Sequence, residues 1–146
     1  MRQGGAGPPG EKYDFTMNVL LVDDHPIIHE TMRAIVRSVR SEATFHGQFD
    51  LAAGLSQASR LQDLDLVLLD LALPDCSGME AFFRFRTEHP ETRVAVISAT
   101  DDSEKVRAAL QAGAAGYLPK TLLPKAMADA IRVILDGGVY SPLDGA

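Results

Sequence analysis

Acidic, hydroxyl and amino side chains stand directly after short apolar runs of this sequence. The acidic residues in such positions are Asp23, Asp24 and Asp70, and Ser98 and Lys120 occupy equivalent positions after later runs. Three carboxylates brought together repel one another unless a cation lies between them, and a set of oxygen ligands suits Mg²⁺ or Mn²⁺. With a hydroxyl and an ammonium beside them, such residues can transfer a phosphoryl group to a carboxylate.

The apolar runs alternate with segments of helical periodicity. Five β-strands are predicted from these runs, at 18–22, 44–49, 64–69, 94–97 and 116–118. Five helices are predicted from the periodic segments, at 26–39, 51–60, 79–89, 103–112 and 124–136. Strict alternation of strand and helix implies an α/β fold whose parallel sheet has helices on both faces. Five such units suit a flavodoxin-like (CheY-like) doubly wound sheet of order 2-1-3-4-5.

The predicted order decides which side chains can meet. In such a sheet the first, third, fourth and fifth strands are neighbours, and ligands bind beyond their carboxyl ends. The five polar residues named above are therefore expected in one crevice. Asp70 is interpreted as the nucleophile, and a bound cation and Lys120 would stabilise the equatorial oxygens of the phosphoryl group.

Composition narrows the class of protein. The chain has 146 residues, which suits one domain, and its net charge of −6 argues against nucleic-acid binding by this segment. Its single cysteine, Cys76, fits a reducing compartment. No apolar stretch has the length of a signal peptide or of a membrane span, so a soluble cytoplasmic protein without membrane contact is predicted.

Four short motifs at the predicted strand ends carry a family resemblance. They are Val-Asp-Asp-His-Pro at 22–26, Leu-Asp-Leu-Ala-Leu-Pro at 69–74 followed by Gly78, Ile-Ser-Ala at 97–99 and Gly-Tyr-Leu-Pro-Lys at 116–120. With all four in this order, the chain from Met17 to about Pro142 resembles the receiver domains of bacterial response regulators. Its closing Gly-Gly-Val-Tyr-Ser-Pro, at 137–142, is similar to the NarL/LuxR-type branch.

The resemblance implies a role for each residue of the acidic set. Asp70 would accept a phosphoryl group from a sensor histidine kinase. Asp24, Asp70 and the backbone carbonyl of Ala72 would ligate Mg²⁺ directly, and Asp23 would hold it largely through water.

The resemblance also implies a phosphate contact and a switch. Lys120, Ser98 and the backbone of Ala99 would bind the phosphoryl oxygens. Tyr117 would turn inward as Ser98 moves toward the phosphate, and the surrounding helices would change their packing.

Domain organisation and partners follow from the same resemblance, except for the N-terminal tail, which is inferred from its glycine and proline content. Residues 1–16 are expected to form a flexible tail, 17–140 the receiver domain, and 141–146 the start of a linker to an output domain that this chain lacks. DNA would be bound only through that missing C-terminal helix-turn-helix domain, and a homodimer could form on phosphorylation. The alternative is a stand-alone receiver or a phosphorelay intermediate.

Other functions are less compatible with the residues present. A phosphatase of the haloacid dehalogenase type needs a second aspartate two residues after its nucleophile, and Ala72 stands there. A flavodoxin-like nucleotide module would need a phosphate-binding loop rich in Gly, Ser or Thr at a strand end. The prediction is therefore a signalling protein with no enzymatic activity beyond Mg²⁺-dependent self-phosphorylation and autodephosphorylation.

Three further expectations concern single residues. Receivers often have Met or Asn where this chain has Ala72, so water should reach the phosphoryl group more readily. The four histidines lie on different elements, which disfavours a histidine metal site, and His25 is expected to pack beside the acidic pair. Phe82, Phe83 and Phe85 cannot share one face of a helix, and Phe85 is expected to be exposed.

Overall fold

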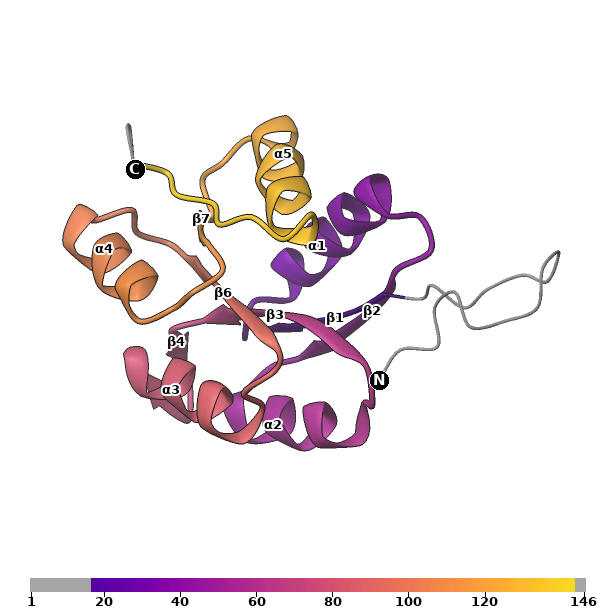
Figure 1. The fold of residues 1–146 in the computed structure, drawn as a ribbon, viewed down its shortest axis with the longest axis vertical. Coiled ribbons are helices and arrows are strands. Elements are labelled where there is room, and N and C mark those ends of the chain that lie inside the picture. The colour runs from indigo at the N-terminus through magenta and orange to yellow at the C-terminus, as the bar shows by residue number, and fades with distance from the viewer. Residues whose placement is uncertain (1–16, 144–146) are drawn as a thin grey trace, which may run out of the picture.

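The computed structural model describes residues 17–143, which form one parallel sheet between two layers of helices (Figure 1). The sheet strands are β1 Asn18–Val22, β2 Thr44–Gln48, β3 Leu64–Asp70, β6 Arg93–Ser98 and β7 Tyr117–Pro119. The helices are α1 Pro26–Val39, α2 Leu51–Arg60, α3 Met79–Glu88, α4 Ser103–Gln111 and α5 Pro124–Leu135. The tail predicted at 1–16 and the last part of the predicted linker, 144–146, lie outside the described residues.

The strand order confirms the predicted topology. Hydrogen-bonded neighbours follow the order β2-β1-β3-β6-β7, and every pair in this sheet is parallel. Parallel pairing turns all five carboxyl ends to the same edge, because each crossover returns the chain across a face of the sheet. The order therefore sets the ends of β1, β3, β6 and β7 side by side.

Alternation along the strands divides the core into two layers. Val19 and Leu21 of β1 pack in the core cluster that includes residues of α1 and α5. Leu20 packs in the second cluster, with residues of α2, α3 and α4. β3 and β6 alternate in the same way, and Figure 1 shows α1 and α5 on the face opposite α2 and α3. Strands covered on both faces must be apolar throughout, which explains why their runs are continuous in the sequence.

A small hairpin follows β3, in a stretch where no strand or helix is predicted from the sequence. β4 Ala72–Leu73 pairs antiparallel with β5 Cys76–Ser77. Between these strands, Asp75 accepts hydrogen bonds from the backbone N–H groups of Leu51 (2.8 Å) and Ala52 (3.0 Å) at the start of α2. These hydrogen bonds hold the pKa of the Asp75 carboxyl below its usual range. The hairpin is thus tied to a helix that is distant in sequence.

The exposed phenylalanine of α3 is Phe83, so the expectation for Phe85 was wrong. Phe82 and Phe85 are fully buried, whereas Phe83 is 51% exposed. Residues three positions apart lie on one side of a helix, and here that side also carries buried Ala81. The sequence pattern allowed more than one pair of rings to face the core, and packing selected one.

The segment after α5 lies along the outer edge of β7. Tyr140 donates its backbone N–H to the carbonyl of Ala115 (3.2 Å) and accepts from the N–H of Tyr117 (3.0 Å). Its ring packs against the α1–α5 cluster, and Leu143 packs against the cluster on the other face. The chain therefore crosses from one helical layer to the other over the last strand.

The described helices were compared with the length and apolar character of membrane-spanning helices. Within residues 17–143, no helix combines the length and the apolar character that crossing a bilayer requires.

Candidate functional site

Asp70 is held by contacts to both of its carboxylate oxygens. It is the last residue of β3 and is only 2% exposed. The backbone N–H of Ala72 donates to Oδ1 (2.9 Å), and the Lys120 ammonium donates to Oδ2 (3.1 Å). Burial raises the pKa of the Asp70 carboxyl, and the negative charge of Asp23 adds to this effect, although both hydrogen bonds oppose it. The buried position of Asp70 therefore favours neutralisation of its carboxylate.

Lys120 connects the end of β7 to the two carboxylates. Its backbone N–H donates to the carbonyl of Ser98 (2.7 Å), which fixes the residue beside the end of β6. Its Nζ lies 2.8 Å from Asp23 Oδ2 as well as 3.1 Å from Asp70 Oδ2. Burial alone would lower the pKa of this ammonium, but its close contacts with the Asp23 and Asp70 carboxylates outweigh this effect and raise the pKa. Lys120 is therefore a fixed positive charge in the crevice.

Asp23 is fully buried and is positioned through its backbone. Its N–H donates to the carbonyl of Gln48 (3.0 Å), which extends the pairing of β1 with β2 by one residue. The ring of buried His29, with Nε2 protonated, donates to the Asp23 carbonyl (2.7 Å). A Cβ on Gly47 would lie 2.4 Å from His29 Nδ1, so the glycine makes room for the ring. This support was not predictable from the sequence, because His29 and Gly47 are ordinary residues of a helix and of a strand there.

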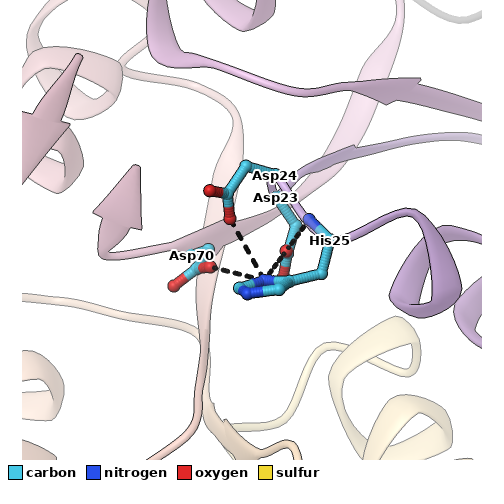
Figure 2. A group of neighbouring side chains, drawn as sticks. All are labelled: Asp23, Asp24, His25 and Asp70. Atoms are coloured by element: carbon cyan, nitrogen blue, oxygen red, sulfur yellow. Dashed lines mark hydrogen bonds and ion pairs between the residues drawn. The ribbon is translucent and has the colours of Figure 1, made fainter. Parts of the chain in front are cut away.

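A cation fits among the carboxylates. Donor atoms of Asp23, Asp24, His25 and Asp70 all lie within 4.8 Å of one another (Figure 2). Asp23 Oδ2 is buried and makes no hydrogen bond, although the Lys120 ammonium lies 2.8 Å from it as an ion-pair partner. Clustered carboxylates with an unsatisfied oxygen are the donor set that a hard divalent cation prefers. Asp24, with Asp23 and Asp70, could therefore hold Mg²⁺ here.

The two predicted switch residues share a hydrogen-bond partner. Ser98 Oγ accepts from the backbone N–H of Thr100 (3.2 Å), and the Tyr117 hydroxyl donates to the carbonyl of the same residue (2.9 Å). The Tyr117 ring is fully buried. Thr100 thus links the two side chains through its backbone, a role that its side-chain type could not reveal.

A cavity of about 510 Å³ opens over this edge of the sheet. Its lining includes most of the residues predicted to handle phosphate, namely Asp70, Ala72, Ser98, Ala99, Tyr117 and Lys120. Thr100 and His25 also line it. Another cavity, of about 490 Å³, lies beside the start of β3 and the end of α3, away from the carboxyl ends where a parallel sheet binds ligands.

The structure thus brings together the residues that sequence spacing had selected. Asp23, Asp70 and Lys120 are in direct contact, and Asp24 joins them through His25. His25 lies beside the acidic pair as expected, with Nδ1 2.9 Å from Asp23 Oδ1. The residues that the sequence did not single out are His29 and Thr100.

Comparison with known proteins agrees with the fold. The model of the response regulator receiver domain family matches residues 19–132. The glycerol metabolism activator of Pseudomonas putida is 35% identical over 126 residues, which cover 86% of this chain and 57% of that protein. An uncharacterized transcriptional regulatory protein of Bacillus subtilis, YxjL, is 31% identical over 83% of this chain and 55% of its own length. This chain therefore spans about half the length of these curated relatives.

Solved structures show the same fold. A LuxR family DNA-binding response regulator from Silicibacter pomeroyi superposes with a TM-score of 0.75 at 29% identity, covering 89% of this chain and 99% of that one. The isolated receiver domain of RcsB from Salmonella enterica gives a TM-score of 0.78 at 22% identity, covering 87% and 94% of the two chains.

A doubly wound sheet whose carboxyl edge carries clustered aspartates and a lysine defines a receiver domain. The chain belongs to the response regulator receiver family, and its homologues are transcriptional regulators of the NarL/LuxR type.

Proposed function

We propose that this receiver is a phosphorylation-activated switch in which Asp70 accepts a phosphoryl group from a phosphohistidine of a sensor kinase. The observation that carries the proposal is the contact of buried Asp70 with Lys120, next to further carboxylates at the same sheet edge. A nucleophile, a fixed cation and a metal-binding donor set are the parts that phosphoryl transfer requires.

The chemistry assigns one task to each group. A carboxylate oxygen of Asp70 bonds to phosphorus while the bond from phosphorus to the kinase imidazole breaks, and that imidazole nitrogen keeps the electron pair. Lys120 stabilises the charge on the phosphoryl oxygens, together with Ser98 and the backbone N–H of Ala99. Asp24, Asp70 and the Ala72 carbonyl would hold Mg²⁺ or Mn²⁺, with Asp23 acting through water, and the ion would supply further charge neutralisation.

The switch follows from the shared partner of Ser98 and Tyr117. If Ser98 turns its hydroxyl toward the phosphoryl group, the N–H of Thr100 loses its acceptor. The turn at Thr100 must then rearrange, and the Tyr117 hydroxyl is bonded to that same turn. Phosphorylation adds charge and strong acceptors at Asp70, so it biases this packing from one arrangement to the other.

The output is proposed to lie in a separate domain. Residues 17–140 form the receiver, and 141–146 begin a linker to a DNA-binding domain of the helix-turn-helix class. Two observations support this: the chain spans about half the length of its curated relatives, and the segment after α5 is bonded to Tyr117 through Tyr140. A stand-alone receiver or phosphorelay intermediate is the alternative, and a cytoplasmic location is part of either form.

The test is a mass measurement after incubation with acetyl phosphate or phosphoramidate and Mg²⁺. We expect one added group of about 80 Da that is labile to hydroxylamine, as an acyl phosphate should be. Asp70→Ala should abolish the addition, and Asp129→Ala, a change of an exposed carboxylate on α5, should retain it. A mass increase that survives in Asp70→Ala would overturn the proposal.

Two further measurements separate this function from its competitors. Sustained turnover of phosphomonoesters would favour an enzyme, whereas one acyl phosphate per chain favours the receiver. Size exclusion during titration with beryllofluoride, a mimic of the phosphoryl group, tests the proposed dimer, which should form only with the mimic present.

A further inference from the structure

His25 lies at the centre of the acidic crevice, with its ring between the carboxylates (Figure 2). Its Nδ1 is 2.9 Å from Asp23 Oδ1, 3.1 Å from Asp24 Oδ1 and 3.9 Å from Asp70 Oδ2. The side chain is also 58% exposed, and Nδ1 is the ring nitrogen that faces the aspartates.

The neighbours of His25 Nδ1 require opposite hydrogen-bonding roles of this one atom. The carboxylates call for a proton on Nδ1, since they can only accept hydrogen bonds. The Lys120 ammonium lies 3.2 Å from the same atom and calls for a lone pair there, since it can only donate. One nitrogen cannot satisfy both. A dication that displaces the Lys120 ammonium from Nδ1 would be bound by the lone pair and by the carboxylates together.

The distances fit shared coordination. Ligand atoms held at about 2.1 Å from one ion lie about 3 Å apart when they are adjacent in an octahedral shell. The separations of Nδ1 from Asp23 Oδ1 and Asp24 Oδ1, 2.9 and 3.1 Å, match that spacing without further movement. Asp24 and His25 are adjacent in sequence, so they can chelate one ion as a pair.

We propose that His25 is a nitrogen ligand of the cation in this crevice and that it makes the site prefer transition-metal dications such as Ni²⁺, Co²⁺ and Zn²⁺. Imidazole suits these ions, whereas Mg²⁺ takes oxygen ligands and gains little from a nitrogen. The inference rests on the proposed function only in that both use the same acidic crevice. It adds a nitrogen ligand and so makes the preference for these ions stronger than three carboxylates alone would.

The experiment uses the full chain without any phosphoryl donor and titrates Ni²⁺ and Mg²⁺ separately by calorimetry near neutral pH. His25→Asn should weaken Ni²⁺ binding at least about 10-fold and change Mg²⁺ binding less than about twofold. The matched control is His89→Gln, because His89 follows α3, away from the crevice, and its Nε2 has no hydrogen bond to lose. With Co²⁺ bound, the visible absorption bands should shift in His25→Asn and not in His89→Gln.

Three results would overturn the inference. They are an unchanged Ni²⁺ affinity in His25→Asn, an equal loss for both metals, and a rise in Mg²⁺ affinity, which would make the imidazole a competitor of the ion. Failure of the proposed function looks different, since it appears as a missing mass increase at Asp70 with the metal preference intact. A chain that is phosphorylated on Asp70 but shows no dependence of Ni²⁺ binding on His25 would sink this inference alone.

Discussion

The Lys120 ammonium lies 3.1 Å from Asp70 Oδ2 and thereby joins the end of β7 to the end of β3 across the intervening β6. It also lies 2.8 Å from Asp23 Oδ2, at the end of β1. One side chain thus neutralises carboxylates from two strands. Because burial still raises the pKa of Asp70, this neutralisation is incomplete, and the remaining cost can be measured.

Asp70→Asn should stabilise the protein at neutral pH. A carboxyl whose pKa is raised on folding contributes stability below its ordinary pKa of 3.8, and that contribution is lost as pH rises through the raised value. At pH 7 the buried Asp70 anion therefore destabilises the folded protein. Its replacement by a neutral amide should raise the free energy of unfolding by about 1 kcal/mol, which corresponds to a Tm higher by a few degrees. The difference should shrink as the pH falls toward 3.8. Calorimetry across this range checks it, with the exposed-site change Asp129→Asn as control, and a lower Tm for Asp70→Asn at pH 7 would contradict it.

Ala72→Met should lengthen the lifetime of the phosphoryl group on Asp70. Ala72 is exposed, lines the cavity beside Asp70 and presents only a methyl group to incoming water. A longer apolar side chain should exclude water, so we expect hydrolysis to slow several-fold. The measurement is the decay of the acyl phosphate after the phosphoryl donor is removed. Ala52→Met, at an exposed position of α2, is the control. An equal or longer lifetime in the wild type would refute this explanation.

Tyr117→Phe should loosen the turn that follows β6. The change removes only the hydroxyl that donates to the Thr100 carbonyl and keeps the buried ring. We expect a loss of about 1 kcal/mol in the free energy of unfolding and faster amide exchange at Thr100. Urea denaturation and hydrogen exchange measure the two effects, and Tyr140→Phe provides the matched removal of a hydroxyl. Unchanged exchange at Thr100 would mean that this hydrogen bond does not hold the turn.

Asp75→Ala should destabilise the protein in a pH-dependent manner. The carboxylate accepts from Leu51 and Ala52 at the start of α2, and its loss should cost about 1 kcal/mol, as for other helix caps. Its pKa is lowered by these hydrogen bonds, so its contribution is present above 3.8 and is lost as pH falls through the lowered value. Unfolding of Asp75→Ala and of exposed Asp101→Ala should be compared from pH 7 downward. Similar stability of the two variants at pH 7 would rule out the cap.

A chain ending at Gly138 should lose protection along β7. It would lack Tyr140, whose backbone forms hydrogen bonds with Ala115 and Tyr117, and also the apolar contacts of Tyr140 and Leu143. We expect a cost of about 1–3 kcal/mol and faster amide exchange at Tyr117, compared with a chain ending at Leu143. If exchange at Tyr117 stayed the same, the segment after α5 would not be coupled to the last strand.

Much of the site was accessible from the sequence because the fold follows from local patterns. Continuous apolar runs predict strands covered on both faces, and strict alternation with helices leaves few topologies for a parallel sheet. Once the order is known, the residues at the ends of neighbouring strands must meet, so the sequence alone predicts Asp23, Asp70, Ser98 and Lys120 at one edge of the sheet. A polar residue at the end of β1, β3, β6 and β7 was a sufficient signal.

Helix phase and backbone contacts were decided by the tertiary structure. Phe83 rather than Phe85 is exposed because α3 buries the face shared by Phe82 and Phe85, and the pattern alone permitted either choice. Thr100 joins Ser98 to Tyr117 through backbone atoms, which every residue type carries and which leave no mark in the sequence.

Side chains that reach across the fold were decided in the same way. The sequence placed His25 beside the aspartates, because it adjoins them along the chain. Only the packed fold set its Nδ1 3.2 Å from Lys120, which is 95 residues away in the chain. His29 supports Asp23 because Gly47 on a neighbouring strand leaves room for its ring. The periodic pattern of the sequence determined the sheet and its acidic edge, whereas these pairings depended on how separate elements fill the space between them.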